Sequence, residues 1–117
     1  MIINIGKKTT PRKNVNVDLA RTYEKLNVAI SLVNLNRFDV LKLMLGSLLN
    51  SDITEHNIKL FYWDNGSIDG SVDYIKNMNI DKVIFENRAN FGLVTPRIRI
   101  MDEILSENVW DHTLEIH

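Results

Sequence analysis

Residues 28–49 decide the fold, with the sequence VAISLVNLNRFDVLKLMLGSLL. The first six residues are almost all apolar and are flanked by asparagines, which is typical of a strand buried on both faces. After a polar loop at residues 34–37, Leu41, Leu45 and Leu48 recur at helical spacing. The stretch therefore predicts a buried strand followed directly by an amphipathic helix.

The same alternation continues along the chain. Residues 58–63, 82–86 and 112–117 predict three further strands, and residues 72–78 and 96–105 predict the helices between them. The order from residue 27 onward is β-α-β-α-β-α-β. This order predicts an α/β, Rossmann-like fold with a mostly parallel sheet and helices on both faces.

The last of these helices has a recognisable beginning. Thr95 is expected as its N-cap and Pro96 as its first helical residue. Its buried face is expected to include Ile98, Met101, Ile104 and Leu105.

The composition of the 117-residue chain fits a single globular domain. With 14 basic and 15 acidic residues the net charge is −1, which gives no sign of a nucleic-acid partner. The absence of cysteine excludes a disulfide framework, a cysteine-ligated zinc site and a thiol nucleophile. No apolar stretch has the length of a membrane span and the N-terminus does not resemble a signal peptide, so we expect a cytoplasmic protein.

The chain divides at residue 27. Residues 1–26 are predicted to form a basic N-terminal arm, with a short strand at Ile2–Ile5, a basic run at residues 7–13 and a short helix at residues 18–26. Residues 27–117 are predicted to form the α/β unit.

Three polar loops follow the first three strands of that unit, at residues 34–37, 64–70 and 87–92. In an open α/β sheet, ligands bind beyond the carboxyl ends of the strands. The Asn, Asp and Gly residues of these loops suit ligand contacts, and they equally suit ordinary turns. Both interpretations remain open for each loop.

Together the loops resemble a known family. Residues 64–70, Asp-Asn-Gly-Ser-Ile-Asp-Gly, are similar to the D-D/N-G-S-x-D-G turn of family 2 glycosyltransferases of the GT-A fold. The Asn-x-x-Asn-x-Gly run of Asn87, Asn90 and Gly92 follows in the expected place. The resemblance covers residues 27–117, the nucleotide-binding half of that family.

The resemblance implies a set of donor-binding residues. The loop after the first strand would lie against the nucleoside base, the second loop against the base or ribose and around the turn, and the third loop at the border of the pocket. An arginine at the start of the last helix would lie near the diphosphate, unless it is simply a solvated helix residue. The residues concerned are Val33, Asn34, Asn36, Asp64, Asn65, Gly66, Asp69, Asn90, Gly92 and Arg97.

The implied activity is transfer of a sugar from a nucleoside-diphosphate sugar to an acceptor hydroxyl on a saccharide, lipid or protein. In the family a divalent Mg²⁺ or Mn²⁺ ion binds the diphosphate through an Asp-x-Asp motif after the fourth strand. No such motif follows here, so the resemblance implies a donor-binding half that stops before the metal ligands. It places neither metal ligands nor catalytic residues in this chain and implies that the chain is inactive alone. The full-length enzyme would work in the cytoplasm or at the cytoplasmic face of a membrane.

Two alternatives compete with this interpretation. A non-catalytic binding or assembly module is supported by departures from the family pattern at Leu35, Asn65 and Ile98. An unrelated Rossmann-like nucleotide binder is disfavoured because no G-x-G-x-x-G follows the first strand.

Two further expectations concern metals and self-association. His112, Glu115 and His117 are ligand types, but strand alternation separates His112 from the other two, so no metal site is predicted. An open sheet leaves exposed edges, which predicts a homo-oligomer formed by self-pairing or through Ile2–Ile5.

Overall fold

The computed structural model describes residues 2–5 and 24–116. The basic run and the short helix expected in the arm lie outside the described residues, except that residues 24–26 are not helical. Five strands, three α-helices and one short 3₁₀ helix form the described part. In chain order they are β1 (Ile2–Ile5), β2 (Asn27–Asn34), α1 (Phe38–Leu49), η1 (Asp52–Glu55), β3 (Asn57–Asp64), α2 (Ser71–Lys76), β4 (Lys82–Glu86), α3 (Val94–Glu107) and β5 (His112–Ile116).

The strands form one sheet in the order β1-β5-β2-β3-β4. The four strands from β5 to β4 are parallel, and β1 pairs antiparallel with β5 at one edge. The predicted α/β fold with a mostly parallel sheet is therefore confirmed. Strands β2 and β3 lie at the centre, as expected for the two longest runs of buried residues.

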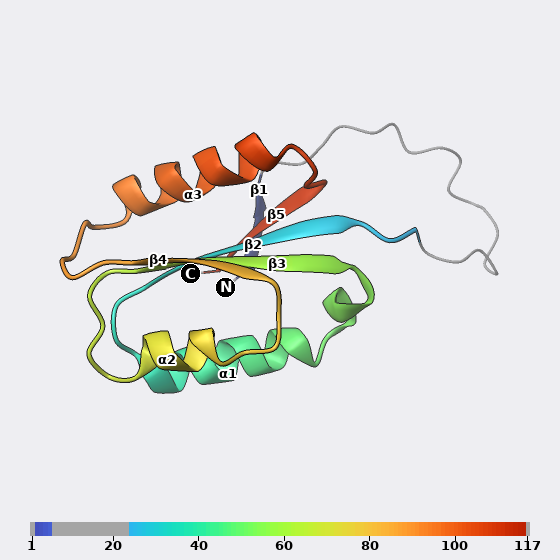
Figure 1. The fold of residues 1–117 in the computed structure, drawn as a ribbon. Coiled ribbons are helices and arrows are strands. Elements are labelled where there is room, and N and C mark those ends of the chain that lie inside the picture. Colours follow the sequence, from blue (N-terminus) through green and yellow to red (C-terminus); the bar gives the residue numbers. More distant parts are fainter. Residues whose placement is uncertain (1, 6–23, 117) are drawn as a thin grey trace.

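Helices cover both faces of the sheet, with α1 and α2 on one side and α3 on the other (Figure 1). Each side has its own apolar core. The α1 side is centred on residues such as Leu41, Leu45 and Tyr62, and the α3 side on Phe61 and Ile104. Side chains of successive strand residues alternate between the two cores because a strand has a period of two.

The register of α3 differs from the sequence-based prediction. The helix begins at Val94 with Leu93 as its N-cap, so Thr95 is not the cap. Its buried residues are Pro96, Ile100 and Ile104, which confirms the prediction for Ile104, whereas Ile98 and Leu105 are 62% and 68% exposed and the prediction for them is wrong. Pro96 is tolerated there because the first four N–H groups of a helix have no intrahelical acceptor.

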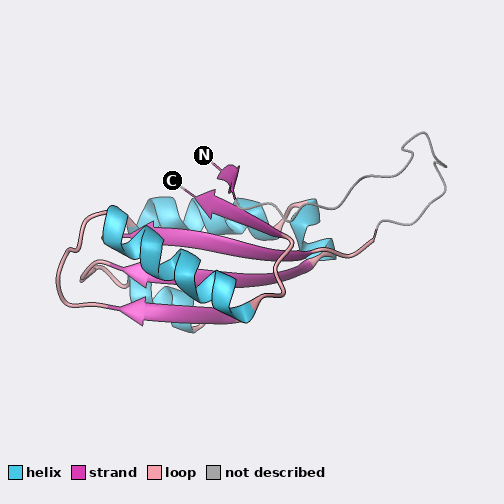
Figure 2. Ribbon diagram, turned by 90° about the horizontal axis from the view of Figure 1, so that it is seen from above, coloured by secondary structure: helices cyan, strands magenta, loops and turns pink. Residues whose placement is uncertain are grey.

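The edges of the sheet are occupied by β1 and β4. Strand β1 lies at one margin and pairs with β5 of the same chain, so the short strand predicted at Ile2–Ile5 is present, whereas association of chains through it stays a prediction. Strand β4 lies at the other margin and pairs with β3 alone among the described strands (Figure 2). Within the described residues, no helix is long and apolar enough to cross a membrane.

Candidate functional site at the carboxyl edge of the sheet

The loops that follow β2, β3 and β4 meet at one edge of the sheet and enclose a cavity of about 230 Å³. Parallel strands present their carboxyl ends at the same edge, which explains why loops distant in sequence meet there. Five of the predicted site residues line the cavity, together with two leucines. The lining is Val33, Asn34, Leu35, Asn65, Asn90, Gly92 and Leu93.

Leu93 lines the cavity although it was not predicted from the sequence as a site residue. It directly follows Gly92 of the Asn-x-x-Asn-x-Gly run, and its side chain is 62% exposed. The available signal in the sequence was a leucine directly after the last glycine of the motif.

Asp64 is buried and both of its carboxylate oxygens accept hydrogen bonds from nearby groups. Oδ1 accepts from the Tyr62 hydroxyl at 2.6 Å, and Oδ2 accepts from the backbone N–H groups of Gly66 at 3.0 Å and Ser67 at 2.6 Å. The carboxylate therefore shapes the turn after β3. Its predicted contact with a base or ribose stays a prediction.

Tyr62 connects Asp64 to the first loop. Its hydroxyl accepts a hydrogen bond from the Asn34 amide nitrogen at 3.0 Å while donating to Asp64. Burial, followed by the hydrogen bond to Asp64, raises the pKa of the Tyr62 phenol far above its usual value. The phenol thus stays neutral and serves as a fixed bridge between the ends of β2 and β3.

Asn65, in the loop after β3, connects this loop to the loop after β4 through hydrogen bonds. Its Oδ1 accepts from the Trp63 indole N–H at 2.8 Å and from the backbone N–H of Phe91 at 3.0 Å. Its Nδ2 donates to the carbonyl oxygen of Gly92 at 2.9 Å. The side chain lies on the cavity wall, and the oxygen that would read a base already accepts two hydrogen bonds.

Gly66 permits the close approach of these two loops. Its φ is 98°, and a Cβ at this position would lie 3.3 Å from the carbonyl carbon of Arg88. Both the left-handed backbone and the lack of space favour glycine.

Asn36 and Asp69 lie outside the cavity and organise the backbone beside it. Asn36 has a φ of 54°, and its Oδ1 accepts from the backbone N–H of Ile68 at 2.9 Å. The Asp69 carboxylate accepts from the first N–H groups of two helices, from Phe38 of α1 at 2.9 Å and from Ser71 of α2 at 3.1 Å. Asp69 thereby satisfies donors that the helices leave without partners.

The charge of Asp69 is stabilised by these contacts. Partial burial acts to raise its pKa, but the hydrogen bonds from Ser71 and Phe38 outweigh that effect and lower the pKa.

The third loop presents the most accessible polar groups of the cavity. Asn90 is exposed, and its Oδ1 accepts from the backbone N–H of Gly92 at 2.8 Å. Gly92 has a φ of 75°, which the tight turn requires. The amide nitrogen of Asn90 has no hydrogen-bond partner among the described residues and faces solvent, so it can donate to a ligand.

Arg97 is held by a carboxylate rather than left free at the helix start. Its Nε donates to Oε1 of Glu115, whose side chain is only 6% exposed, whereas that of Arg97 is 46% exposed. The hydrogen bond and the charge of Glu115 raise the pKa of Arg97. Arg97 does not line the cavity, and its predicted contact with a diphosphate stays a prediction.

The described residues do not fit a divalent metal ion. The carboxylates of Asp64 and Asp69 at this edge are directed at hydroxyl and backbone donors. In the part of the chain that the structure describes, no group of three or more His, Cys, Asp or Glu side chains could hold a metal. A Mg²⁺ or Mn²⁺ ion therefore receives no ligand set from these residues.

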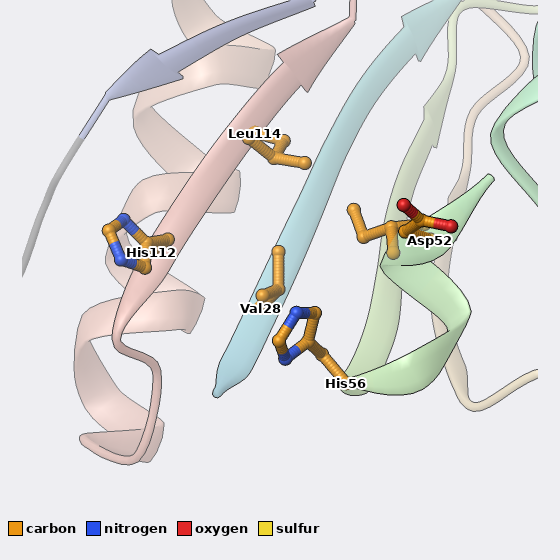
Figure 3. A pocket seen from close by; sticks show the side chains of 6 residues that line it. Val28, Asp52, His56, His112 and Leu114 are labelled. Atoms are coloured by element: carbon orange, nitrogen blue, oxygen red, sulfur yellow. The ribbon is translucent and has the colours of Figure 1, made fainter. Parts of the chain in front are cut away.

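A separate hollow of about 310 Å³ lies at the opposite, amino-terminal ends of the strands. His56 and His112 contribute to its wall, but their imidazole rings do not point toward one another (Figure 3). The Nδ1 atom of His56 accepts from the backbone N–H of Leu26 at 3.1 Å. This histidine pair accordingly behaves as part of the wall and not as a ligand pair.

Comparison with known proteins identifies no relative of this chain. No protein-family model matches it, and neither a curated protein nor a solved structure matches it.

Proposed function

We propose that the cavity at the carboxyl edge binds the nucleoside portion of a nucleoside-diphosphate sugar, and that the chain is the donor-binding half of a glycosyltransferase. One observation supports the proposal. The three loops on which the family resemblance rests meet around one cavity, and five of the ten expected residues line it. Ligands of α/β sheets occupy this position in general.

The size and lining of the cavity fit a part of the nucleoside-diphosphate sugar and not the whole molecule. At about 230 Å³ it is smaller than the roughly 300–1,000 Å³ of sites that enclose a whole drug-sized molecule. Val33, Leu35 and Leu93 offer apolar contact to the face of a base, and the Asn90 amide offers a donor to a ring carbonyl. A base and part of its ribose fit this description, with the diphosphate and sugar outside.

In the proposed reaction the bond between the anomeric carbon and the diphosphate oxygen breaks, and a bond from that carbon to an acceptor oxygen forms. The acceptor proton passes to a carboxylate base, which the resemblance does not place among residues 27–117. The role of this chain is to hold and orient the nucleoside. The absence of cysteine suits a reducing compartment, and we propose the cytoplasm as its location.

Calorimetric titration with UDP, GDP and dTDP tests the proposal. We expect saturable binding of at least one nucleotide and a roughly tenfold weaker Kd in Asn90→Ala, as the loss of one hydrogen bond implies. Asn79→Ala is the matched control, because Asn79 is an exposed asparagine before β4 and away from the cavity. Equal binding by the Asn90→Ala variant would contradict the assigned site.

A second candidate is a non-catalytic binding or assembly module. It is favoured by one observation, that the side-chain oxygens of Asp64 and Asn65 accept hydrogen bonds from the protein itself. No heat with any of the three nucleotides would support this second candidate over the first.

A further inference from the structure

Strand β4 is an open edge of the sheet. It pairs with β3 on one side, and no described strand pairs with its other side (Figure 2). Unpaired backbone groups along an edge are a template for another strand.

The backbone direction of each β4 residue follows from the flanking hydrogen bonds. The carbonyl of Asp81 accepts from the N–H of Leu60 at 2.9 Å, and the N–H of Asn87 donates to the carbonyl of Asp64 at 3.2 Å. Odd-numbered residues thus direct their backbone groups toward β3, and alternation along the strand directs those of Lys82, Ile84 and Glu86 outward.

These outward residues match a second copy of the same strand. In an antiparallel pair centred on Ile84, Lys82 lies opposite Glu86 of the second copy, and Ile84 lies opposite itself. The three hydrogen-bonded positions of such a pair are the three outward residues. Both Lys–Glu pairs place opposite charges across the strands, which is the favourable arrangement.

The side chains of Lys82 and Glu86 keep hydrogen-bonding groups available for this pairing. The Lys82 ammonium donates to the carbonyls of Met78 at 2.8 Å and Ile80 at 3.4 Å, which leaves its third N–H. Glu86 pairs with Lys76 through Oε1 and its side chain is 53% exposed, so its second oxygen can accept.

The partial burial of the apolar residues in β4 also favours a neighbouring strand. Val83, Ile84 and Phe85 are only partly buried, whereas Phe61 and Tyr62 of the neighbouring β3 are fully buried. A neighbouring strand would cover the remaining apolar surface. Lone charges on an edge discourage pairing, but a lysine and a glutamate equally distant from the strand centre instead select one register.

We infer that the protein forms a two-fold symmetric homodimer in which β4 pairs antiparallel with β4 of the second copy, producing one continuous sheet. The opposite edge, β1, has the sequence IINI and carries no charge that could select a register. The inference rests on the β4 edge alone and does not depend on nucleotide binding.

Sedimentation velocity of the wild type and charge-reversal variants tests the dimer. Lys82→Glu and Glu86→Lys each place like charges opposite one another twice per dimer, and we expect the dimer Kd to rise about tenfold in each. The double variant restores both pairs with their signs exchanged and is expected to regain most of the wild-type affinity. Asp102→Lys is the control for charge change, because Asp102 is exposed on α3 away from β4.

A monomer at every concentration up to the solubility limit would overturn the inference, as would a dimer that none of the β4 variants weakens. Circular dichroism checks that each variant is folded. Amide hydrogen exchange on the wild type gives a measurement that needs no variant. The outward N–H groups of Lys82, Ile84 and Glu86 should gain protection as concentration rises, and concentration-independent exchange there would refute the pairing.

Discussion

The amide nitrogen of Asn65 donates a hydrogen bond to the carbonyl oxygen of Gly92 at 2.9 Å. The oxygen of the same side chain accepts from the backbone N–H of Phe91 at 3.0 Å. One side chain in the turn after β3 therefore holds two consecutive residues of the loop after β4. The position of that loop, and with it one wall of the cavity, depends on an amide at position 65.

Asn65→Asp should destabilise the protein although it is nearly isosteric. A carboxylate cannot donate to the Gly92 carbonyl, and its charge would be buried at a position that is 4% exposed. We expect a loss of about 2 kcal/mol in the free energy of unfolding, measured by urea denaturation.

Asn79→Asp is the control for this substitution, because Asn79 is exposed and its change should leave stability nearly unaltered. Equal stabilities of the Asn65→Asp variant and the wild type would show that the amide is not what holds the loop.

Two glycines should respond to alanine in opposite directions. Gly66 has a φ of 98°, which an alanine rarely adopts, and the Cβ of Gly66→Ala would lie 3.3 Å from the carbonyl carbon of Arg88. We expect a loss of about 1–3 kcal/mol. Gly46 lies within α1 and its Cβ would have no neighbour within 4 Å, so Gly46→Ala should gain about 1 kcal/mol from helix propensity.

Thermal denaturation of both variants tests this pair. A destabilised Gly46→Ala together with an unchanged Gly66→Ala would contradict the helical conformation assigned to Gly46 and the left-handed conformation assigned to Gly66.

The strand–helix order was predictable because each element has an uninterrupted period. The predicted and observed bounds of α1 agree at Phe38–Leu49, and the predicted stripe of Leu41, Leu45 and Leu48 is the buried face. In α3 the apolar residues surround more of the helix, and the predicted face combined Ile104 with Ile98 and Leu105. Ile104 does face the sheet, but its buried neighbour is Ile100, and the sequence pattern alone did not fix the direction of the face.

The meeting of the three loops was predictable from the sequence, but the hydrogen bonds within the candidate site were not. Loops at residues 34–37, 64–70 and 87–92 were expected to meet, because parallel strands end at one edge, and they do. Whether Asp64 and Asn65 turn toward a ligand or toward their own backbone depends on the packing of Tyr62 and Trp63 beneath them. That packing is a tertiary feature which residue type does not reveal.

Asp69 should make stability depend on pH in the acid range. Its folded-state pKa is lowered from the ordinary 3.8, so its contribution is complete well above that value and is lost as pH falls through the folded pKa. The melting temperature of the wild type should therefore fall below about pH 4, and Asp69→Asn should lack that part of the decline.

At neutral pH, Asp69→Ala removes the acceptor of the first N–H of both α1 and α2 and should cost about 1 kcal/mol for each helix. Asp102→Ala, at an exposed position within α3, is the control. Identical acid profiles for the wild type and Asp69→Asn would refute the role of this carboxylate.

Arg97 and Arg99 lie two residues apart on α3 and are both exposed, yet only Arg97 pairs with a buried carboxylate. Arg97→Met should therefore lower the urea midpoint more than Arg99→Met does, because it removes the cation beside the Glu115 charge. Arg97→Lys is expected to recover part of the loss, since an ammonium keeps the charge without the fixed geometry of the guanidinium. If Arg97 instead acts only as a ligand-facing cation, Arg97→Met and Arg99→Met will have the same midpoint, and nucleotide affinity alone will differ.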